Sequence, residues 1–242
     1  MIVWETMDTP VGPLFVAAEE RGIVSISFLR GRSVAGEIAR LEKAGFGPAD
    51  AAVAARSETG AGPSLREAGP MRRADLSGGA HPHENASPRA AAHVRAAVAQ
   101  LGEYFSGRAR GFDLDLWLVG TEFQEKIWRA IARIPCGSTW SYGELARAIG
   151  LPATAIRAVG GAVGDNPVAI VVPCHRVVGA KGALTGFGGG IDAKKWLLDH
   201  EAGVLDLPLL GGMTTPLATS AGRKARSAPA KKRAGRGGAR SR

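Results

Sequence analysis

Apolar and polar residues alternate in short runs at the start of the chain, and segments rich in turn-forming residues separate these runs. The β-forming runs cover residues 2–7, 14–18 and 23–29. Short runs of this kind, joined by turns, predict a β-meander. Residues 33–44 then place Val34, Ile38 and Leu41 at helical spacing. We therefore expect residues 1–45 to form the first part of a small α+β domain.

Residues 46–86 have a different character, being rich in Gly, Pro, Ala and Ser and poor in large apolar side chains. Such a segment cannot bury enough surface to offset the entropy that ordering would cost. We predict a disordered insert or linker here. It contains His81 and His83, for which solvent exposure is a simpler interpretation than a metal site.

Periodic patterning returns at Ser87, which precedes Pro88 in the arrangement typical of a helix N-cap. The apolar face of this predicted helix consists of Val94, Val98, Leu101 and Phe105. Residues 112–118 alternate apolar and acidic side chains, which predicts a half-buried strand. Residues 87–118 would then complete the N-terminal domain.

Residues 119–205 are predicted to form a mostly helical domain. Thr121 and Gln124 have the spacing of a capping box, and the helix that follows would bury Phe123, Ile127 and Ile131. Further on, short helices over 141–149 and 153–163 flank a turn containing Gly150. Two short helices across such a turn predict a helix-turn-helix, although many helical hairpins share the pattern without binding DNA.

The second of these helices carries little side-chain bulk. Its small residues are Ala155, Ala158, Gly160, Gly161 and Ala162. One interpretation is close packing of the helix against the protein core. The other is close approach of its backbone to a nucleic-acid groove.

Cys174 is the residue with the clearest chemical potential. An apolar run over 168–172, expected to be strand-like, ends at Pro173 and presents Cys174 beside His175. A free thiol has a pKa of about 8.5, so a nucleophilic Cys needs a base or a cationic neighbour. Adjacent side chains often point apart, however, and most Cys residues of cytosolic proteins are small buried hydrophobic residues.

A glycine cluster over 186–190 follows, and after it a predicted helix that contains Glu201. The cluster lacks the features of a phosphate loop and of a dinucleotide fingerprint, so a pocket rim or tight turn suits it better. Glu201 has two interpretations. It either orients a histidine as the third member of a relay or caps a helix end.

Composition narrows the class of protein. The chain has 242 residues, of which 45% are hydrophobic, and only two Cys, which excludes a disulfide-rich scaffold and a multi-cysteine zinc module. No apolar run approaches the roughly 18 residues of a membrane span, and the N-terminus lacks a signal-peptide pattern. We expect a cytoplasmic protein with no membrane partner.

The excess positive charge lies at the C-terminus. The chain contains 31 Lys plus Arg against 22 Asp plus Glu, and residues 219–242 hold nine basic residues and no acidic ones. Without them, 31 − 9 = 22 basic residues balance 22 acidic ones. We expect residues 206–242 to be a disordered basic tail. It either adds non-specific DNA affinity or is a solvated extension with little effect.

Five motifs occur together and in order over residues 120–202. They are YGELA at 142–146, RAVGGA at 157–162, NP at 166–167, PCHRVV at 173–178 and WLLDHE at 196–201. With them the chain closely resembles the O6-alkylguanine-DNA alkyltransferases, also called methylated-DNA–protein-cysteine methyltransferases. The resemblance is looser at the N-terminus and absent from the linker and tail.

The resemblance implies an α+β fold, with a ribonuclease-H-like N-terminal domain and a helical C-terminal domain. It implies single-turnover DNA repair, in which Cys174 takes the alkyl group of O6-methylguanine and, less readily, of O4-methylthymine. The partner would be double-stranded DNA, bound through the minor groove by a monomer with the damaged base flipped out.

The same resemblance assigns roles to individual residues. Arg157 would fill the gap left by the flipped base, and Ala155, Ala158, Gly160 and Gly161 would let the helix approach the groove closely. Tyr142 would crowd the phosphate and donate a hydrogen bond to the guanine. His175, through a water molecule, would take the proton of Cys174 while Glu201 orients the imidazole. Asn166 would act as a hinge, and the pocket would include Pro173, Val177, Phe187 and Gly188.

The chain departs from the family pattern in three places. The turn between the two short helices is one residue longer than usual, Phe187 replaces a frequent Tyr, and Gly188 replaces a frequent Ser. Residues 1–45 also lack the Cys and His ligands of the zinc site found in some animal members, so we predict no metal and no cofactor. Two alternatives stay open, a non-catalytic module that recognises alkylated DNA and a cysteine hydrolase using Cys174 and His175.

Overall fold

The computed structural model describes residues 1–47 and 87–206. The predicted insert, apart from its first two residues, lies outside the described residues, as do His81, His83 and the basic tail beyond Asp206. Of the helices in the two described segments, none combines the length and the apolar character that a membrane span requires.

Three antiparallel strands form the predicted meander. They are β1 (Val3–Met7), β2 (Leu14–Glu19) and β3 (Gly22–Phe28), paired in the order β1-β2-β3. Side chains alternate between the two sheet faces, so Leu14 and Val16 join one apolar cluster while Phe15 and Ala17 join another. Both faces are therefore buried.

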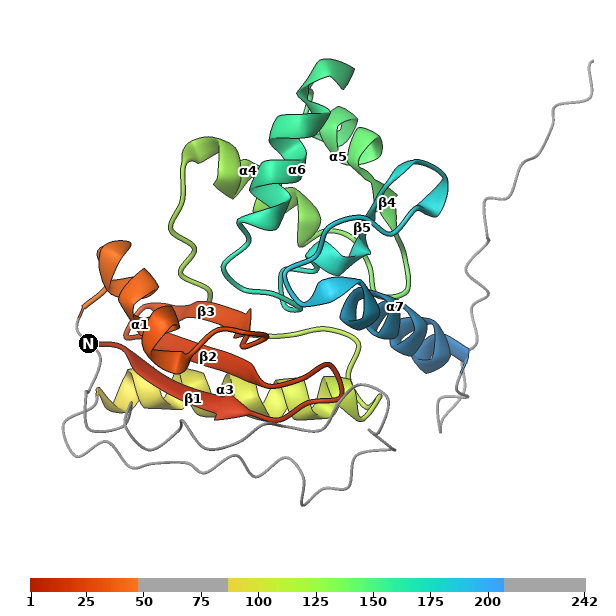
Figure 1. Ribbon diagram of the computed structural model, residues 1–242. Coiled ribbons are helices and arrows are strands. Elements are labelled where there is room, and N and C mark those ends of the chain that lie inside the picture. The colour runs from red at the N-terminus through yellow and green to blue at the C-terminus, as the bar shows by residue number, and fades with distance from the viewer. Residues whose placement is uncertain (48–86, 207–242) are drawn as a thin grey trace, which may run out of the picture. The chain divides into compact units, whose positions relative to one another are not determined.

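Two helices cover the sheet, one on each face (Figure 1). They are α1 (Val34–Lys43) and α3 (Pro88–Phe105). The helical spacing of Val34, Ile38 and Leu41 is confirmed, because all three are buried against the sheet. Helix α3 begins where the sequence predicted, with Pro88 in its first turn, but the Ser87 side chain makes no capping hydrogen bond.

The predicted strand over 112–118 is wrong as a full strand. Only Leu116 forms a bridge, parallel to Ile23, with the Ile23 amide donating to Asp115 O at 2.8 Å and the Trp117 amide to Ile23 O at 2.9 Å. The reason is that a second segment uses the same edge of β3. There the Ile26 amide donates to Pro167 O, and the Ala169 amide donates to Ile26 O.

The boundary of the N-terminal domain also lies later than residue 45. Phe46 packs edge-on against Trp117 with ring centroids 5.2 Å apart, and the Gly47 amide donates to the Glu19 carboxylate at 2.8 Å. These two residues belong to the ordered domain because a large aromatic side chain and a backbone hydrogen bond fix them.

The helical part begins with α4 (Glu122–Ile131), followed by β4 (Trp140–Ser141) and α5 (Tyr142–Ala148). Thr121 and Gln124 make both bonds of the predicted capping box, and Ser141 and Glu144 make a second box at α5. Helix α4 packs on α6 (Ile156–Gly164), and buried Trp128 donates its indole N–H to Ala162 O at 2.8 Å.

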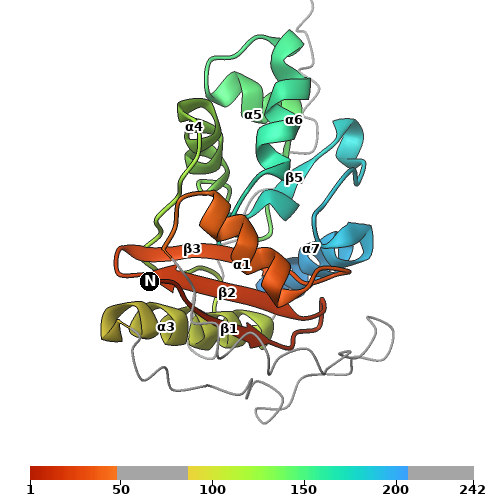
Figure 2. The ribbon, with the colours of Figure 1, turned by 60° about the vertical axis from the view of Figure 1, so that its left-hand side comes forward.

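The helix predicted over 153–163 begins later than expected. Residues Ala153–Ala155 form a 3-10 turn, η2, before α6 starts at Ile156, because the Ala155 amide bonds Pro152 O in a tighter turn. Figure 2 shows α5 and α6 side by side, which confirms the helical pair. The elements that follow are η3 (Cys174–Arg176), β5 (Val177–Val178), η4 (Ala180–Gly182) and α7 (Gly190–Asp206).

Candidate active site

The run over 168–172 forms a compact turn rather than the expected strand-like segment. The Val172 amide donates to Val168 O and the Val171 amide to Ala169 O, each at 2.9 Å, while Ile170 adopts φ +72°. A positive φ is strained for a β-branched residue. Pairing of this turn with the edge of β3 holds it in place, and Cys174 follows at the start of η3.

Asn166 closes the two ends of this turn. Its side-chain amide donates to Val172 O at 2.7 Å, and its side-chain oxygen accepts from the Val168 amide at 3.1 Å. One residue at the end of α6 thus fixes the backbone that leads to Cys174.

Cys174 is buried, with 8% of the residue exposed. Burial raises its pKa, and a hydrogen bond with Asn166 and the charge of Lys194 oppose that rise only in part. Lys194 is itself buried and donates to Val177 O at 2.7 Å and to Thr185 O at 3.0 Å. The resting thiol is therefore protonated near neutral pH, and nucleophilic attack requires a base.

His175 is fully buried next to Cys174, with Nε2 lying 2.7 Å from Glu201 Oε1. An ionised carboxylate only accepts, so Nε2 carries the proton of the neutral ring. Nδ1 has no hydrogen-bond partner among the described residues. Burial lowers the pKa of His175 despite the opposing effect of Glu201. The imidazole is therefore neutral, with a lone pair free to accept a proton.

The carboxylate of Glu201, on α7, is fully enclosed by donors. Arg176 donates to both oxygens, the Tyr104 hydroxyl donates to Oε1 at 2.8 Å, and the Gly137 amide donates to Oε2 at 3.0 Å. Burial would raise the pKa of Glu201, but the hydrogen bonds and charges of His175 and Arg176 hold it well below its usual range. Glu201 is therefore a buried negative charge in hydrogen-bond contact with His175, and it lies inside α7 rather than at an end of the helix.

Cys174 lines a cavity of about 230 Å³. This volume is smaller than the roughly 300 Å³ at which pockets for drug-sized ligands begin, so it suits one small ring system. Among the predicted site residues, those that line it are Tyr142, Gly160, Asn166, Cys174, Phe187 and Gly188. Pro173 and Val177 are buried and are not among the residues that line this cavity.

Part of the cavity wall comes from the N-terminal domain, and sequence reasoning missed it. These residues are Ile26, Ser27, Phe28 and Arg32. Arg32 donates to the buried carboxylate of Glu37 at 3.0 Å, and that carboxylate also accepts from Ser27 and Arg40. The one signal for this wall in the sequence was Glu37, an acidic residue on the apolar face of the helix predicted over residues 33–44. Tyr104 and Arg176 were also missed, because their contacts with Glu201 are distant in sequence.

The exposure of residues on the outer face of α6 distinguishes the two interpretations of its small residues. Arg157, Ala158 and Gly161 are exposed, and a Cβ added at Gly161 would meet no atom within 4 Å. Packing within the chain therefore does not require glycine at Gly161. Ala162 is buried, so the packing interpretation holds at that position. Ala155 and Gly160 are half-buried, and a Cβ at Gly160 would only touch Tyr142.

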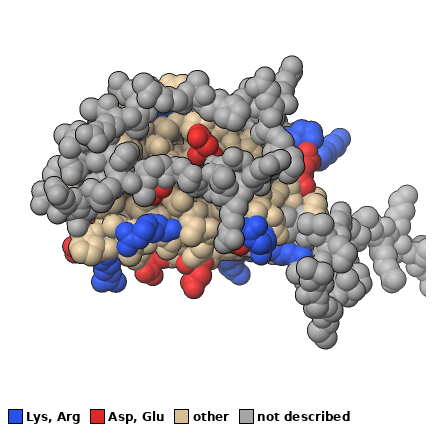
Figure 3. Space-filling model, turned by 90° about the horizontal axis from the view of Figure 1, so that it is seen from below, with Lys and Arg blue, Asp and Glu red and all other residues tan. Residues whose placement is uncertain are grey.

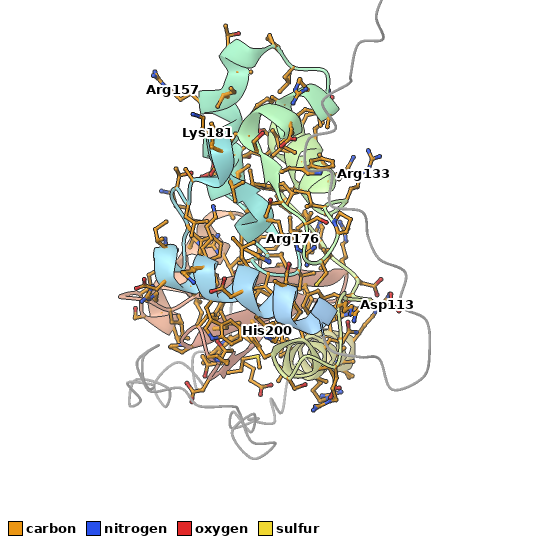
Figure 4. The ribbon with its side chains drawn as sticks, turned by 90° about the vertical axis from the view of Figure 1, so that its right-hand side faces the viewer. Asp113, Arg133, Arg157, Arg176, Lys181 and His200 are labelled. Atoms are coloured by element: carbon orange, nitrogen blue, oxygen red, sulfur yellow. The ribbon has the colours of Figure 1, made fainter. Side chains whose placement is uncertain are left out.

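Figure 4 shows Arg157 projecting outward from the N-terminal end of α6, with Lys181 on the same side. Arg133 points away on the opposite side, and Arg176 lies in the interior. Near α3, seen from below, described basic and acidic side chains are interspersed (Figure 3). The described residues on that face thus present no field of a single sign that would attract DNA.

Together these residues supply a nucleophile, a neutral base and a fixed anion beside a small cavity. Such an arrangement can ionise a thiol at the moment of attack, because the charge that forms on the imidazole is stabilised by Glu201. The described residues contain no cluster of three or more His, Cys, Asp or Glu side chains that could hold a metal ion.

Two family models match the chain. The description "6-O-methylguanine DNA methyltransferase, DNA binding domain" covers residues 122–203, and the ribonuclease-like domain of the same family covers residues 2–51. Both matches agree with the division into an α+β part and a helical part.

Curated relatives carry the name methylated-DNA–protein-cysteine methyltransferase. The chain is 59% identical to that of Mycolicibacterium paratuberculosis over 115 residues, 48% of this chain and 67% of the relative. For Mycobacterium tuberculosis the identity is 57% over 105 residues, 43% of this chain and 63% of the relative, so the match spans slightly less than two thirds of that protein. For Methanosarcina barkeri it is 35% over 198 residues, 82% of this chain and 96% of the relative.

Solved structures give the same result. The O6-methylguanine methyltransferase of Mycobacterium tuberculosis is 34% identical, with a TM-score of 0.58 over 84% of this chain and 94% of that chain. A structure of the OGT protein from the same organism in complex with DNA is 35% identical, with a TM-score of 0.56 over 83% of this chain and 93% of that one.

Proposed function

This chain belongs to the 6-O-methylguanine DNA methyltransferase family, and on that premise we propose that it repairs DNA by direct alkyl transfer to Cys174. The substrate is O6-methylguanine, with O4-methylthymine as a lesser one. The observation that carries the proposal is the free Nδ1 of a neutral His175 held by Glu201, next to a cysteine that lines a cavity.

The reaction uses the relay as follows. His175 takes the thiol proton on Nδ1, through a water molecule, and Glu201 stabilises the imidazolium. The Cys174 sulfur then bonds to the alkyl carbon while the bond from that carbon to O6 breaks. The electron pair stays on the guanine, which takes up a proton from water, and the imidazolium later returns the thiol proton to water. Because water does not hydrolyse the thioether, each protein molecule reacts once.

DNA binding is assigned to α6 and its flanking side chains. The exposed small residues Ala158 and Gly161 let the helix backbone approach the walls of the minor groove. Arg157 projects from the same helix and takes the place of the flipped base, which offsets part of the unstacking cost of a few kcal/mol. The DNA complex of the similar mycobacterial protein supports DNA as the partner. We assign a monomer as the binding form.

The cavity receives the flipped base. Tyr142 and Phe187 contribute aromatic walls, and Gly160 and Gly188 leave room for a flat ring. The missing phenol at Phe187 removes one hydrogen bond to the base, so backbone groups and Tyr142 carry its recognition.

The proposal is tested by intact-protein mass and peptide mapping after incubation with duplex DNA carrying one O6-methylguanine. We expect a gain of one methyl group on Cys174 and one lesion repaired per protein. Tight lesion-selective binding without a mass gain would instead favour a recognition module. Repeated turnover on esters or peptides would favour a cysteine hydrolase.

A further inference from the structure

Glu201 receives one hydrogen bond from a part of the chain that neither family model covers. Tyr104, in the last turn of α3, lies between the matched segments 2–51 and 122–203. Its hydroxyl reaches Glu201 across 97 positions of sequence, at 2.8 Å, and both side chains are buried. A phenylalanine would fill the same volume, so packing does not explain the hydroxyl.

We propose that Tyr104 is a positioning residue of the alkyl-transfer site, whose hydroxyl donates to Glu201 Oε1 and so sets how strongly that oxygen holds His175. The inference rests on the proposed function, because it assigns Tyr104 to the same proton relay. Tyr104 does not touch the reacting atoms and acts through Glu201.

The backbone and ring of Tyr104 are fixed independently of this bond. His200 Nε2 lies 2.7 Å from Tyr104 O, and the phenol ring packs against Phe105, Phe112 and His200. The hydroxyl is therefore presented to Oε1 by a rigid ring, at little further entropic cost. Through Tyr104, the helix that covers the sheet is joined to the active-site carboxylate.

The hydroxyl shares Oε1 with His175 and thereby sets the basicity of the imidazole. Burial and the adjacent carboxylate raise the pKa of Tyr104 well above its ordinary value, so the phenol stays protonated and donates. Without that donor, more negative charge on Oε1 is available to His175. The imidazolium becomes more stable, and the pKa of His175 rises.

Other charged or titratable groups near His175 are retained when the hydroxyl is removed. Glu201 and Lys194 face it from α7, Arg176 and Cys174 lie on its own turn, and Cys136 lies beside Glu201 in the loop after α4. A change confined to the Tyr104 hydroxyl therefore reports on the one hydrogen bond.

The test is Tyr104→Phe in the full chain, with single-turnover methyl transfer measured from about pH 5 to 9, which spans the ordinary pKa values of His and Cys. Since His175 must be neutral to accept the thiol proton, we expect the acidic limb to move to higher pH by about 0.5 to 1 unit. At a fixed pH on that limb, the shift makes methyl transfer by Tyr104→Phe about 3- to 10-fold slower than by wild type.

The matched control is Phe105→Leu, which perturbs a buried neighbour on α3 that packs on Tyr104 and Trp196 and whose side chain has no group that could donate a hydrogen bond to Glu201. We expect it to lower the unfolding temperature without moving the limb. A Tyr104→Phe profile that is unchanged, or that falls equally at every pH, overturns the proposal.

A second readout separates this proposal from the proposed function. Carboxamidomethylation of Cys174 by iodoacetamide, without DNA, follows the same relay and should show the same shift even if no methyl is transferred. In a Tyr142→Phe background Tyr104 is the one remaining tyrosine. Replacing it there by 3-fluorotyrosine keeps the ring shape and strengthens the donor, so it should move the limb to lower pH than in the unfluorinated Tyr142→Phe protein. A fluorinated protein that shows no shift also contradicts the role.

Discussion

At Cys174 and His175, burial acts on both partners of a proton transfer. It raises the pKa of the thiol and lowers that of the imidazole, so each is neutral before substrate arrives. The hydrogen bond from Nε2 to Glu201 leaves Nδ1 as the accepting atom. In the proposed reaction, the free protein would therefore hold an unreactive thiol, and attack would depend on a charge pair that the carboxylate stabilises.

The lowered pKa of His175 predicts how stability depends on pH. Below about pH 6.5 an unfolded chain protonates this histidine while the native protein does not, so acidification favours unfolding. We expect the free energy of unfolding to fall as the pH drops from about 6.5 toward the lowered pKa of the native state. The lowered pKa of Glu201 adds a further loss below about pH 4.5, its ordinary range.

Denaturant titrations of wild type and His175→Gln at several pH values measure this contribution. The variant should show a shallower dependence between about pH 5 and 6.5, because it lacks the group that titrates only in the unfolded state. Equal slopes for the two proteins would show that other groups cause the acid sensitivity.

Arg32 offers a prediction about the cavity wall. Its side chain is 59% exposed and pairs with Glu37, which keeps Arg40 as a second partner. Arg32→Ala should therefore cost less than about 1 kcal/mol of stability. We expect alkyl transfer to slow about 10-fold, equivalent to about 1.4 kcal/mol, because a cavity proposed to receive a phosphate-bearing nucleotide loses a positive charge from its wall. Arg40 also pairs with Glu37 but does not line the cavity. Arg40→Ala should therefore leave the rate of alkyl transfer close to that of wild type.

At the scale of elements, α6 has an inner face that packs and an outer face that does not need small residues for folding. Val159 and Ala162 are buried against the core, whereas Ala158 and Gly161 are exposed. Glycine inside a helix costs about 0.5–1 kcal/mol relative to alanine, so its presence on an open face needs a reason outside the fold. The close approach of DNA that we propose for this helix would supply that reason.

The substitution Gly161→Leu tests whether the outer face of α6 serves DNA binding rather than folding. The substitution should keep or raise the unfolding temperature, since the site is open and leucine is the better helix former. Affinity for duplex DNA should fall at least about 10-fold, because the larger side chain blocks close approach to the groove. Fluorescence anisotropy measures the affinity, and Ala96→Leu on the exposed side of α3 is the matched control. Unchanged DNA affinity would assign the binding surface elsewhere.

For the whole molecule, one edge of the sheet organises the site. Strand β3 pairs with Leu116 near its start and with Val168, in the turn before Cys174, near its centre. The side chains of Ile26, Ser27 and Phe28 on the same strand line the cavity. Tyr104 makes a second connection from the sheet side, through α3 to α7. The N-terminal domain therefore contributes to the wall of the cavity that Cys174 lines.

At the scale of the whole molecule, the distribution of net charge leads to a prediction about residues 219–242. Residues 1–218 carry equal numbers of basic and acidic side chains, so residues 219–242 supply the whole excess of nine positive charges. Deleting residues 219–242 should weaken non-specific DNA binding and flatten the dependence of log K on log salt. Titrations at several salt concentrations measure the slope, and an identical slope would show that the tail does not contact DNA.

The sequence by itself determined the features that depend on neighbours along the chain. The meander, the helix α1 and the capping box at Thr121 and Gln124 follow from periodicity and cap chemistry, which act over a few residues. The ordered motifs of residues 142–201 likewise identified the family and put Cys174, His175 and Glu201 forward together.

Only the tertiary structure decided the features that depend on which distant segments share an edge or a cavity. The apolar run 168–172 reads as a strand, yet it turns because β3 offers it only a short stretch of edge, and the same sharing limits residues 112–118 to a single bridge. Tyr104 has no local signature, since its hydroxyl acts on Glu201, 97 positions away. Arg32 pairs with nearby Glu37, but the cavity that it lines is completed by residues far away in sequence. Such contacts are set by packing of whole elements, which no local pattern encodes.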